Sequence, residues 1–273
     1  MKNNKCGVIP GKFILVLIAV FLSAAISVSP SAYAGGDAAV PNEGQAEPDI
    51  RVAPGLNYVD NELFYGDADG IPAASIGVDT SFYNGMVDWE QLKEIGVDFA
   101  LIRVGGRGWG NGSLYTDNWF RNSLLSAQKA GISVGVYFYS MAANSPEAKR
   151  EALYVIEKLD GIELDLPIYM DMEFSGDYPS GRTDGLPTAE RVDFALAFCK
   201  EIERAGYSAG IYASESFFHD ELNYDAISDY SIWVASYTEN NKRPAFENFD
   251  IWQFTDSARL PGVSGSCDVN VRF

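Results

Sequence analysis

From Ile76 onward, the chain alternates between short apolar segments and segments with apolar residues at helical spacing. The apolar segments predict strands at 76–82, 99–105, 133–140, 167–174, 208–214, 231–237, 250–255 and 268–272. The helical spacing predicts helices at 88–95, 117–130, 145–159 and 187–205, each followed by a glycine that suits a helix C-terminus. Repeated strand–helix units with continuously apolar strands indicate a parallel sheet covered by helices.

The number of strands favours a closed sheet. Eight candidate strands in roughly 200 residues fit a barrel better than an open doubly wound sheet. The later connections are too short for full helices. We therefore predict an α/β fold over residues 76–273, an irregular (β/α) barrel of about eight strands with fewer than eight helices.

The N-terminal residues have the pattern of an export signal. Residues 1–34 combine a basic start, an apolar core at 13–28 and a small-residue cleavage site at Ala32-Tyr33-Ala34. An uncleaved anchor is the alternative, but the apolar core is shorter than the ~20 residues of a membrane span. We expect a signal peptide, a protein secreted to the cell wall, and no stable membrane anchor. Residues 35–75 are expected to form an acidic spacer or N-terminal arm, partly disordered.

Composition excludes several classes of function. The formal net charge of −18 argues against nucleic-acid binding, which needs a basic face. A single histidine, His219, without HExxH or CxxC patterns leaves no catalytic zinc or Ser-His-Asp triad, so we expect no metal and no cofactor. Cys199 and Cys267 are too few for a disulfide framework, and whether they pair stays open. A monomer is the default expectation.

Two acids interrupt the apolar strand at 167–174. Asp171 and Glu173 lie two residues apart, so both point to the same side of the strand, together with Tyr169. When two carboxyls share a buried site, one is usually held protonated. One proton donor beside one anion is the minimum equipment for cleaving a glycosidic bond. The alternative is structural, with the aspartate capping a loop and the glutamate pairing with an arginine.

Other polar residues are expected to meet these two acids. Reactive groups of parallel barrels gather at the C-terminal ends of the strands. Asp79 on the first strand and Asp268 on the last become neighbours if the barrel closes, so four carboxylates would line one pocket. The glycine-rich 105–110 segment suits a substrate-lining loop. Aromatic residues that could hold sugar rings, or simply fill the barrel, are Tyr137, Tyr169, Tyr212, Trp233 and Tyr237.

A series of motifs in fixed order resembles one known family. The motifs are Gly77-Val78-Asp79-Thr80-Ser81, the 98–104 strand, Gly135-Val136-Tyr137-Phe138-Tyr139-Ser140, the 167–173 strand, Asp250-Ile251-Trp252-Gln253-Phe254, the 261–265 loop and Asp268-Val269-Asn270. Together they resemble glycoside hydrolase family 25, the Chalaropsis-type lysozymes. The resemblance implies an irregular β/α barrel. It also implies hydrolysis of the β-1,4 bond between N-acetylmuramic acid and N-acetylglucosamine, with bacterial peptidoglycan glycan strands as the partner.

The resemblance also implies roles for single residues. Glu173 matches the family's general acid, Asp171 matches the orienting or stabilising carboxylate, and Asp79 and Asp268 match the other two active-site acids. Arg103 is expected either to contact substrate or to form a structural ion pair. The third strand departs from the family's frequent Tyr-His-Phe. The residues expected to bind substrate are Tyr137, Tyr169, Tyr212, Trp233, Gln253 and Arg103.

Several alternatives stay open at this point. The group that attacks the sugar is Asp171, the substrate's own acetamido group, or water. Instead of a lysozyme, the chain could be a chitinase-like glycosidase acting on another N-acetylated glycan. It could also be a catalytically idle barrel that only binds glycan.

Overall fold

The computed structural model describes residues 54–60, 62–176, 178–238, 242–245 and 248–273. The predicted signal peptide, 1–34, and residues 35–53 of the predicted spacer lie outside the described residues. Everything below therefore concerns the compact unit that ends at Phe273.

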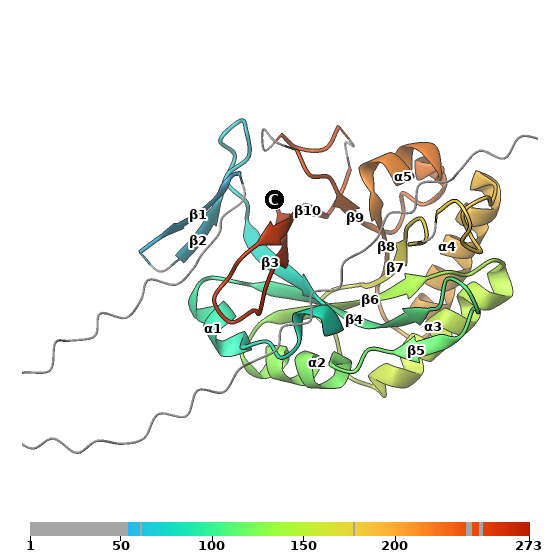
Figure 1. Cartoon of the computed structure of the whole chain (residues 1–273), viewed down its shortest axis with the longest axis horizontal. Coiled ribbons are helices and arrows are strands. Elements are labelled where there is room, and N and C mark those ends of the chain that lie inside the picture. Colours follow the sequence, from blue (N-terminus) through green and yellow to red (C-terminus); the bar gives the residue numbers. More distant parts are fainter. Residues whose placement is uncertain (1–53, 61, 177, 239–241, 246–247) are drawn as a thin grey trace, which may run out of the picture. The chain divides into compact units, whose positions relative to one another are not determined.

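Eight strands of the described chain close into a barrel (Figure 1). In the order in which they pair, they are β3 (Ser75–Thr80), β4 (Phe99–Arg107), β6 (Ser133–Ser140), β7 (Ile168–Met172), β8 (Ala209–Ser214), β9 (Ser231–Ala235), β10 (Ile251–Ala258) and β11 (Cys267–Arg272). The pairing of β3 with both β4 and β11 closes the sheet. The predicted irregular barrel is confirmed, with each strand near its expected position.

The prediction of a fully parallel sheet is wrong for the last strand. β11 runs antiparallel to both β10 and β3, whereas the other barrel pairs are parallel. The reason lies in the connection after β10. Residues 259–266 contain no helix, and a short link returns the chain antiparallel, because a parallel return needs a longer crossover.

The described residues contain five α-helices: α1 (Trp89–Glu94), α2 (Phe120–Lys129), α3 (Ser145–Leu159), α4 (Thr188–Arg204) and α5 (Glu215–Asp220). The first four agree with the prediction. Helix α5 was not predicted, because six residues are too few to show a helical period. Helices α2 and α3 cover β4 and β6, and α4 covers β7 and β8 (Figure 1). Over the described ranges, no helix combines the length and apolar character that a membrane span requires.

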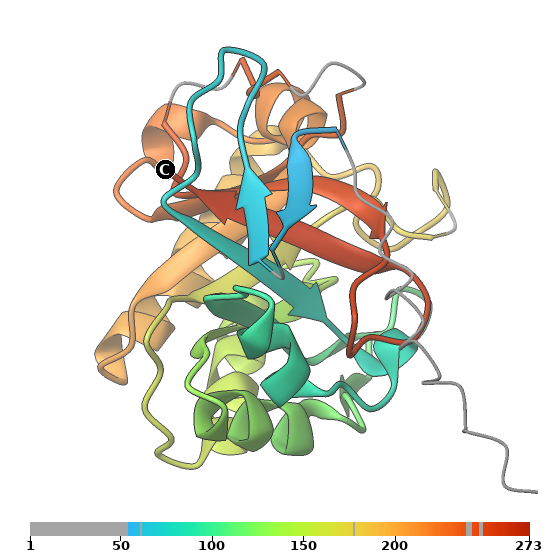
Figure 2. The same cartoon turned by 90° about the vertical axis from the view of Figure 1, so that its left-hand side faces the viewer.

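A hairpin covers the part of the barrel near its closing strands. It consists of β1 (Leu56–Val59) and β2 (Glu62–Tyr65), and Figure 2 shows it in front of the red C-terminal strands. The Tyr65 ring packs against Trp252 and Phe254 of β10, with centroid distances of 5.9 and 4.4 Å. This short hairpin shields outward-facing aromatic side chains of β10.

Inward-facing side chains fill the barrel separately from the core beneath the helices. Alternate strand residues face the two sides, so each strand contributes to both regions. The interior cluster is formed by Phe99, Leu101, Tyr137, Leu166, Tyr169, Tyr212, Trp233, Ala235 and Ile251. Three members of this cluster, Tyr137, Tyr212 and Trp233, also line a pocket at the end of the barrel where its parallel strands finish.

Tight filling of the interior predicts a stability effect at Gly210 on β8. A methyl group there would overlap the Tyr169 ring and lie 2.7 Å from the carbonyl oxygen of Ser231. We expect Gly210→Ala to lower the free energy of unfolding by about 1–3 kcal/mol, measured by urea denaturation. The matched control is Gly185→Ala, where the added carbon meets no atom within 4 Å. Equal stabilities of the two variants would contradict this account.

Candidate active site

All four acids predicted from the sequence line one pocket at the C-terminal ends of the parallel strands. Asp79 lies near the end of β3, Asp171 on β7, and Glu173 just after β7. Asp268 reaches the same edge from the start of β11, because that antiparallel strand pairs Asp268 directly with Asp79. The pocket has a volume of about 580 Å³.

Two side-chain amides hold the Asp79 carboxylate. Gln253 Nε2 and Asn270 Nδ2 donate to Asp79 Oδ2 at 2.7 and 2.8 Å. Trp233 Nε1 donates to Asn270 Oδ1 at 2.8 Å and so turns the Asn270 amino group toward Asp79. Asn270 was not named as a site residue. The sequence feature that could have identified it is its position two residues after Asp268, which places both side chains on the inward side of β11.

Gln253 lines the pocket and supports the Asp79 carboxylate. The Tyr237 hydroxyl donates to Gln253 Oε1 at 2.6 Å, and the Tyr212 hydroxyl, 2.9 Å from the same oxygen, shares its one proton between Gln253 and Glu173. These bonds leave the Gln253 amino group for Asp79. Gln253 is only 2% exposed but lines the pocket, so it orients Asp79 while its contact with substrate stays a prediction.

Asp79 and Asp268 share a hydrogen bond, and their environments differ. Burial, and then the charge of Asp79, raise the pKa of Asp268 to about 9. Burial also raises the pKa of Asp79, but hydrogen bonds from Asn270, Gln253 and Asp268 oppose this and favour its anion. At neutral pH Asp268 therefore carries the proton that it donates to Asp79.

Asp171 and Glu173, at the end of β7 and just after it, form a second pair of acids in a different environment. Burial, with the charge of Glu173 next, raises the pKa of Asp171 well above its ordinary value, although Arg103 opposes this. Asp171 Oδ1 is buried without a hydrogen-bond partner among the described residues. Glu173 lies where the pocket opens. Desolvation by the surrounding protein raises its pKa, whereas a hydrogen bond from Tyr212 lowers it. The site thus offers a proton donor beside an oxygen that can accept an N–H or O–H from a ligand.

The predicted substrate-binding residues separate into two groups. Five of the six line the pocket: Tyr137, Tyr212, Trp233, Gln253 and Arg103. Tyr169 does not: it is fully buried one layer deeper, 5.5 Å from the Trp233 ring, and its hydroxyl lies 2.9 Å from Ser231 Oγ. Tyr169 fills the barrel, so its predicted substrate contact is wrong.

Arg103 forms the structural ion pair that the sequence left open and also lines the pocket, where its contact with substrate stays a prediction. Its Nε donates to Asp117 Oδ2 at 2.9 Å, while its guanidinium lies 5.1 and 5.4 Å from the ring centres of Phe82 and Tyr83. The arginine thereby supports an exposed aromatic pair at the rim while its own surface faces the pocket.

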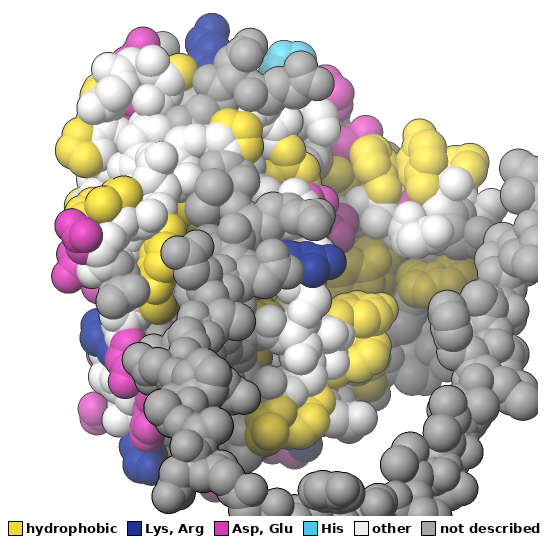
Figure 3. Space-filling model, turned by 60° about the vertical axis from the view of Figure 1, so that its left-hand side comes forward, with side chains coloured by type: hydrophobic (Ala, Val, Ile, Leu, Met, Phe, Trp, Pro, Cys, Tyr) yellow, Lys and Arg dark blue, Asp and Glu magenta, His cyan; other side chains and the backbone are white. Residues whose placement is uncertain are grey.

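The rim of the pocket is aromatic. Tyr237, a predicted candidate for holding sugar rings, lines it together with four aromatic residues that were not candidates: Tyr83, Trp109, Tyr115 and Tyr139. Trp109 belongs to the glycine-rich segment expected to line the substrate. Figure 3 shows hydrophobic side chains gathered in several separate patches on one face of the molecule. Exposed rings of this kind give flat surfaces on which sugars can stack.

A second hollow continues the pocket beyond Glu173. It has a volume of about 670 Å³, reaches helix α5, and shares Glu173, Tyr212 and Tyr237 with the first. The two hollows together form a groove that passes Glu173 on both sides, which suits a chain-like ligand. In the part of the chain that is described, no group of three or more His, Cys, Asp or Glu side chains is arranged to hold a metal ion.

Comparison with known families gives one clear match. The model of the family described as "Glycosyl hydrolases family 25" matches residues 78–263. The chain is 27% identical over 196 residues to the autolytic lysozyme of Clostridium acetobutylicum, covering 71% of this chain and 54% of that protein. It is 26% identical over 272 residues to lysozyme M1 of Streptomyces globisporus, covering 96% and 89%. The chain thus spans about half the length of the first relative and most of the second.

Solved structures share the fold. The modular autolysin LytC of Streptococcus pneumoniae, solved with a synthetic peptidoglycan ligand, superposes with a TM-score of 0.69 at 24% identity, over 81% of this chain and 53% of that one. The spore cortex lytic enzyme SleM of Clostridium perfringens gives a TM-score of 0.62 at 25% identity, over 73% and 67%. The barrel described above is therefore an architecture already known in solved proteins.

Proposed function

Because the chain belongs to glycosyl hydrolases family 25, we propose that it is a secreted lysozyme of bacterial peptidoglycan. The reaction is hydrolysis of the β-1,4 bond between N-acetylmuramic acid and N-acetylglucosamine. The observation that carries the proposal is the convergence of Asp79, Asp171, Glu173 and Asp268 in one aromatic-rimmed groove. Peptidoglycan lies outside the cell membrane, so the leader pattern in residues 1–34 fits this substrate.

Glu173 is the proposed general acid. Its raised pKa favours the protonated form, and it stands in the middle of the groove, where a glycan chain would pass. Glu173 donates its proton to the glycosidic oxygen as the bond to the anomeric carbon breaks. Positive charge then develops on the sugar ring, beside the Asp79 anion held by its two amides.

Asp171 is the proposed orienting carboxylate. Its Oδ1 is buried and without a partner among the described residues, so a ligand N–H can satisfy it. The acetamido N–H of the sugar is a suitable donor. Held in this way, the acetamido oxygen can attack the anomeric carbon from the side opposite the leaving oxygen, and water later opens the resulting ring.

The proposal is tested with purified peptidoglycan and chitin as separate substrates. We expect clearing of peptidoglycan alone and, after borohydride reduction of the products, muramitol at the new reducing ends by mass spectrometry. Glucosaminitol as the only reduced sugar would contradict cleavage after muramic acid. Clearing of chitin would support the chitinase-like alternative, and binding without cleavage of either glycan would support an idle glycan-binding barrel.

The pH dependence of the reaction is a further prediction. Activity should fall as pH rises through the pKa of Glu173, because the proton needed for transfer is lost. The Tyr212 hydroxyl favours the Glu173 anion, so Tyr212→Phe should move this alkaline limb of kcat/KM to higher pH. Gln253 keeps its bond from Tyr237, so its amide stays oriented.

Tyr237→Phe is the matched control for this experiment. It removes the other hydroxyl bound to Gln253 without removing a hydrogen bond to Glu173. The alkaline limb of kcat/KM of Tyr237→Phe should lie at the same pH as that of the unmodified protein. A Tyr212→Phe limb that shifts to lower pH would contradict the assignment of the proton to Glu173.

A further inference from the structure

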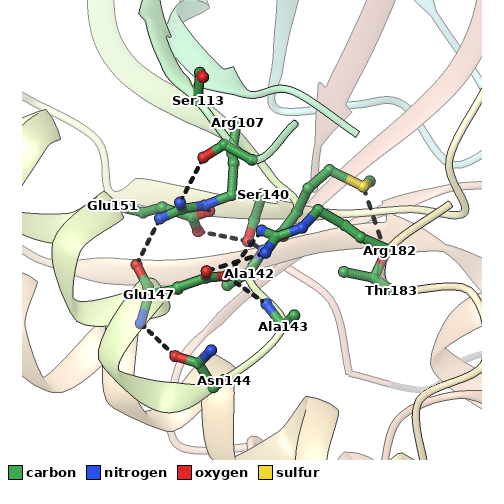
Figure 4. A network of polar contacts seen from close by, with 12 residues as sticks. Arg107, Ser113, Ser140, Ala142, Ala143, Asn144, Glu147, Glu151, Arg182 and Thr183 are labelled. Atoms are coloured by element: carbon green, nitrogen blue, oxygen red, sulfur yellow. Dashed lines mark hydrogen bonds and ion pairs between the residues drawn. The ribbon is translucent and has the colours of Figure 1, made fainter. Parts of the chain in front are cut away.

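A network of polar contacts lies behind one wall of the groove (Figure 4). Its centre is Glu147 in the first turn of α3. Arg182 donates to both carboxylate oxygens of Glu147, from Nη1 at 2.8 Å and from Nη2 at 3.0 Å. The backbone N–H of Ala143 donates to the same carboxylate at 2.9 Å. Such a two-pronged, partly shielded pair is stronger and more directional than a single surface contact.

One arm of the network holds the loop after β4. Arg107, the last residue of β4, donates from Nη2 to the backbone carbonyl of Glu147 at 3.1 Å and from Nη1 to that of Gly112 at 2.8 Å. Its Nε donates to the buried Glu151 at 2.6 Å. These bonds fasten the loop 108–113 to helix α3, and this loop places Trp109 in the groove.

The other arm holds the segment that follows Glu173. Arg182 lies in this segment and also donates from Nη1 to the carbonyl of Met141, just after β6, at 2.7 Å. Its guanidinium packs against the first loop, because a carbon added to Gly112 would lie 3.0 Å from Arg182 Cζ. Arg182 thus joins the loops after β4, β6 and β7 at one point.

We propose that the Arg182–Glu147 pair is a positioning device that sets the spacing of two groove walls and thereby the affinity for the glycan chain. Neither residue lines the groove, but the loops that they join contribute Trp109 and Gly176 to it. The segment after Glu173 also presents the exposed Phe174–Tyr178 ring pair, with centroids 4.6 Å apart. The inference rests on the proposed lysozyme function.

The test measures KM and kcat on soluble glycan strands prepared from peptidoglycan. Arg182→Ala should raise KM about tenfold and leave kcat within about twofold, since Glu173 and Asp171 keep their own surroundings. Arg182→Lys keeps the positive charge but loses the two-pronged hydrogen bonding of the guanidinium, so its KM should lie between those of Arg182→Ala and the unmodified protein. The control is Arg204→Ala, which breaks an exposed Arg–Glu pair on α4 and should change neither constant.

A double-mutant cycle separates positioning from general loss of stability. Glu147→Gln should raise KM in the same direction, and the combination with Arg182→Ala should be no worse than the larger single effect. An unchanged KM in Arg182→Ala would overturn the inference, as would equal losses of kcat and of the folded fraction. Failure of the unmodified protein to cleave peptidoglycan would instead remove the proposed function, so the two failures are distinguishable.

Discussion

Replacing Glu173 with glutamine is expected to slow peptidoglycan hydrolysis by about a hundredfold to ten-thousandfold. The amide has nearly the same shape as the protonated acid, but it cannot deliver a proton to the leaving oxygen. The Tyr212 hydroxyl can still donate to the amide oxygen, so the site should keep its geometry. The rate is measured with soluble glycan strands, and thermal unfolding is measured in parallel.

The control for this variant is Glu190→Gln. Glu190 is exposed in the first turn of α4, outside both hollows of the groove, so the same chemical change there should leave the rate unaltered. Thermal unfolding of the Glu173 variant should match that of the unmodified protein. Turnover near the rate of the unmodified protein would show that Glu173 is not the general acid. One of the other three carboxyl groups would then have to supply the proton.

The sequence predicts the barrel because its strands and helices have clear periods. The strand predicted at 268–272 was found, but its direction was not, since direction depends on the connection before it rather than on its own residues. Strand β5 (Leu114–Thr116) and helix α5 were not predicted, because three and six residues are too short to show a period. Length therefore limits what periodicity can detect.

The site shows a related limit. Alternation along a strand gives the side to which a residue points, but not its depth in the barrel. Tyr169 and Asp171 share the inward side of β7, yet only Asp171 reaches the pocket. Tyr83 lies in the three-residue 3-10 helix Phe82–Asn84 and Tyr115 on the three-residue strand β5, both too short to show a period. The four acids were found because polar residues in apolar strands stand out.

Hydrogen bonds offset the free-energy cost of burying a carboxylate more fully at Asp79 than at Asp171. Asp79 accepts two amide N–H groups and the Asp268 hydrogen bond, whereas Asp171 Oδ1 has no partner in the described part of the chain. A buried carboxylate without a donor destabilises the folded protein when it ionises. Asp171 is therefore a position where function and stability should oppose each other.

Asp171→Asn is expected to lower the hydrolysis rate by about a hundredfold to a thousandfold while it raises the melting temperature at pH 7 to 8. The asparagine cannot supply the negative charge that holds the substrate. The stability gain follows from the raised pKa of Asp171, whose ordinary value is 3.8. The folded state binds the Asp171 proton more tightly than the unfolded state does, so stability falls as pH rises from about 4 through the raised pKa.

The gain should therefore disappear at pH values below about 4, where Asp171 is protonated in both states. Calorimetric melting temperatures of the two proteins across this pH range measure the difference. Asp117→Asn is the contrasting control, because Asp117 accepts hydrogen bonds from Arg103, Phe82 and Trp119. That variant should lose stability at pH 7. If Asp171 had a structural role, Asp171→Asn would be expected to behave like Asp117→Asn. A similar loss of stability in the two variants would therefore contradict the proposal that Asp171 Oδ1 binds substrate.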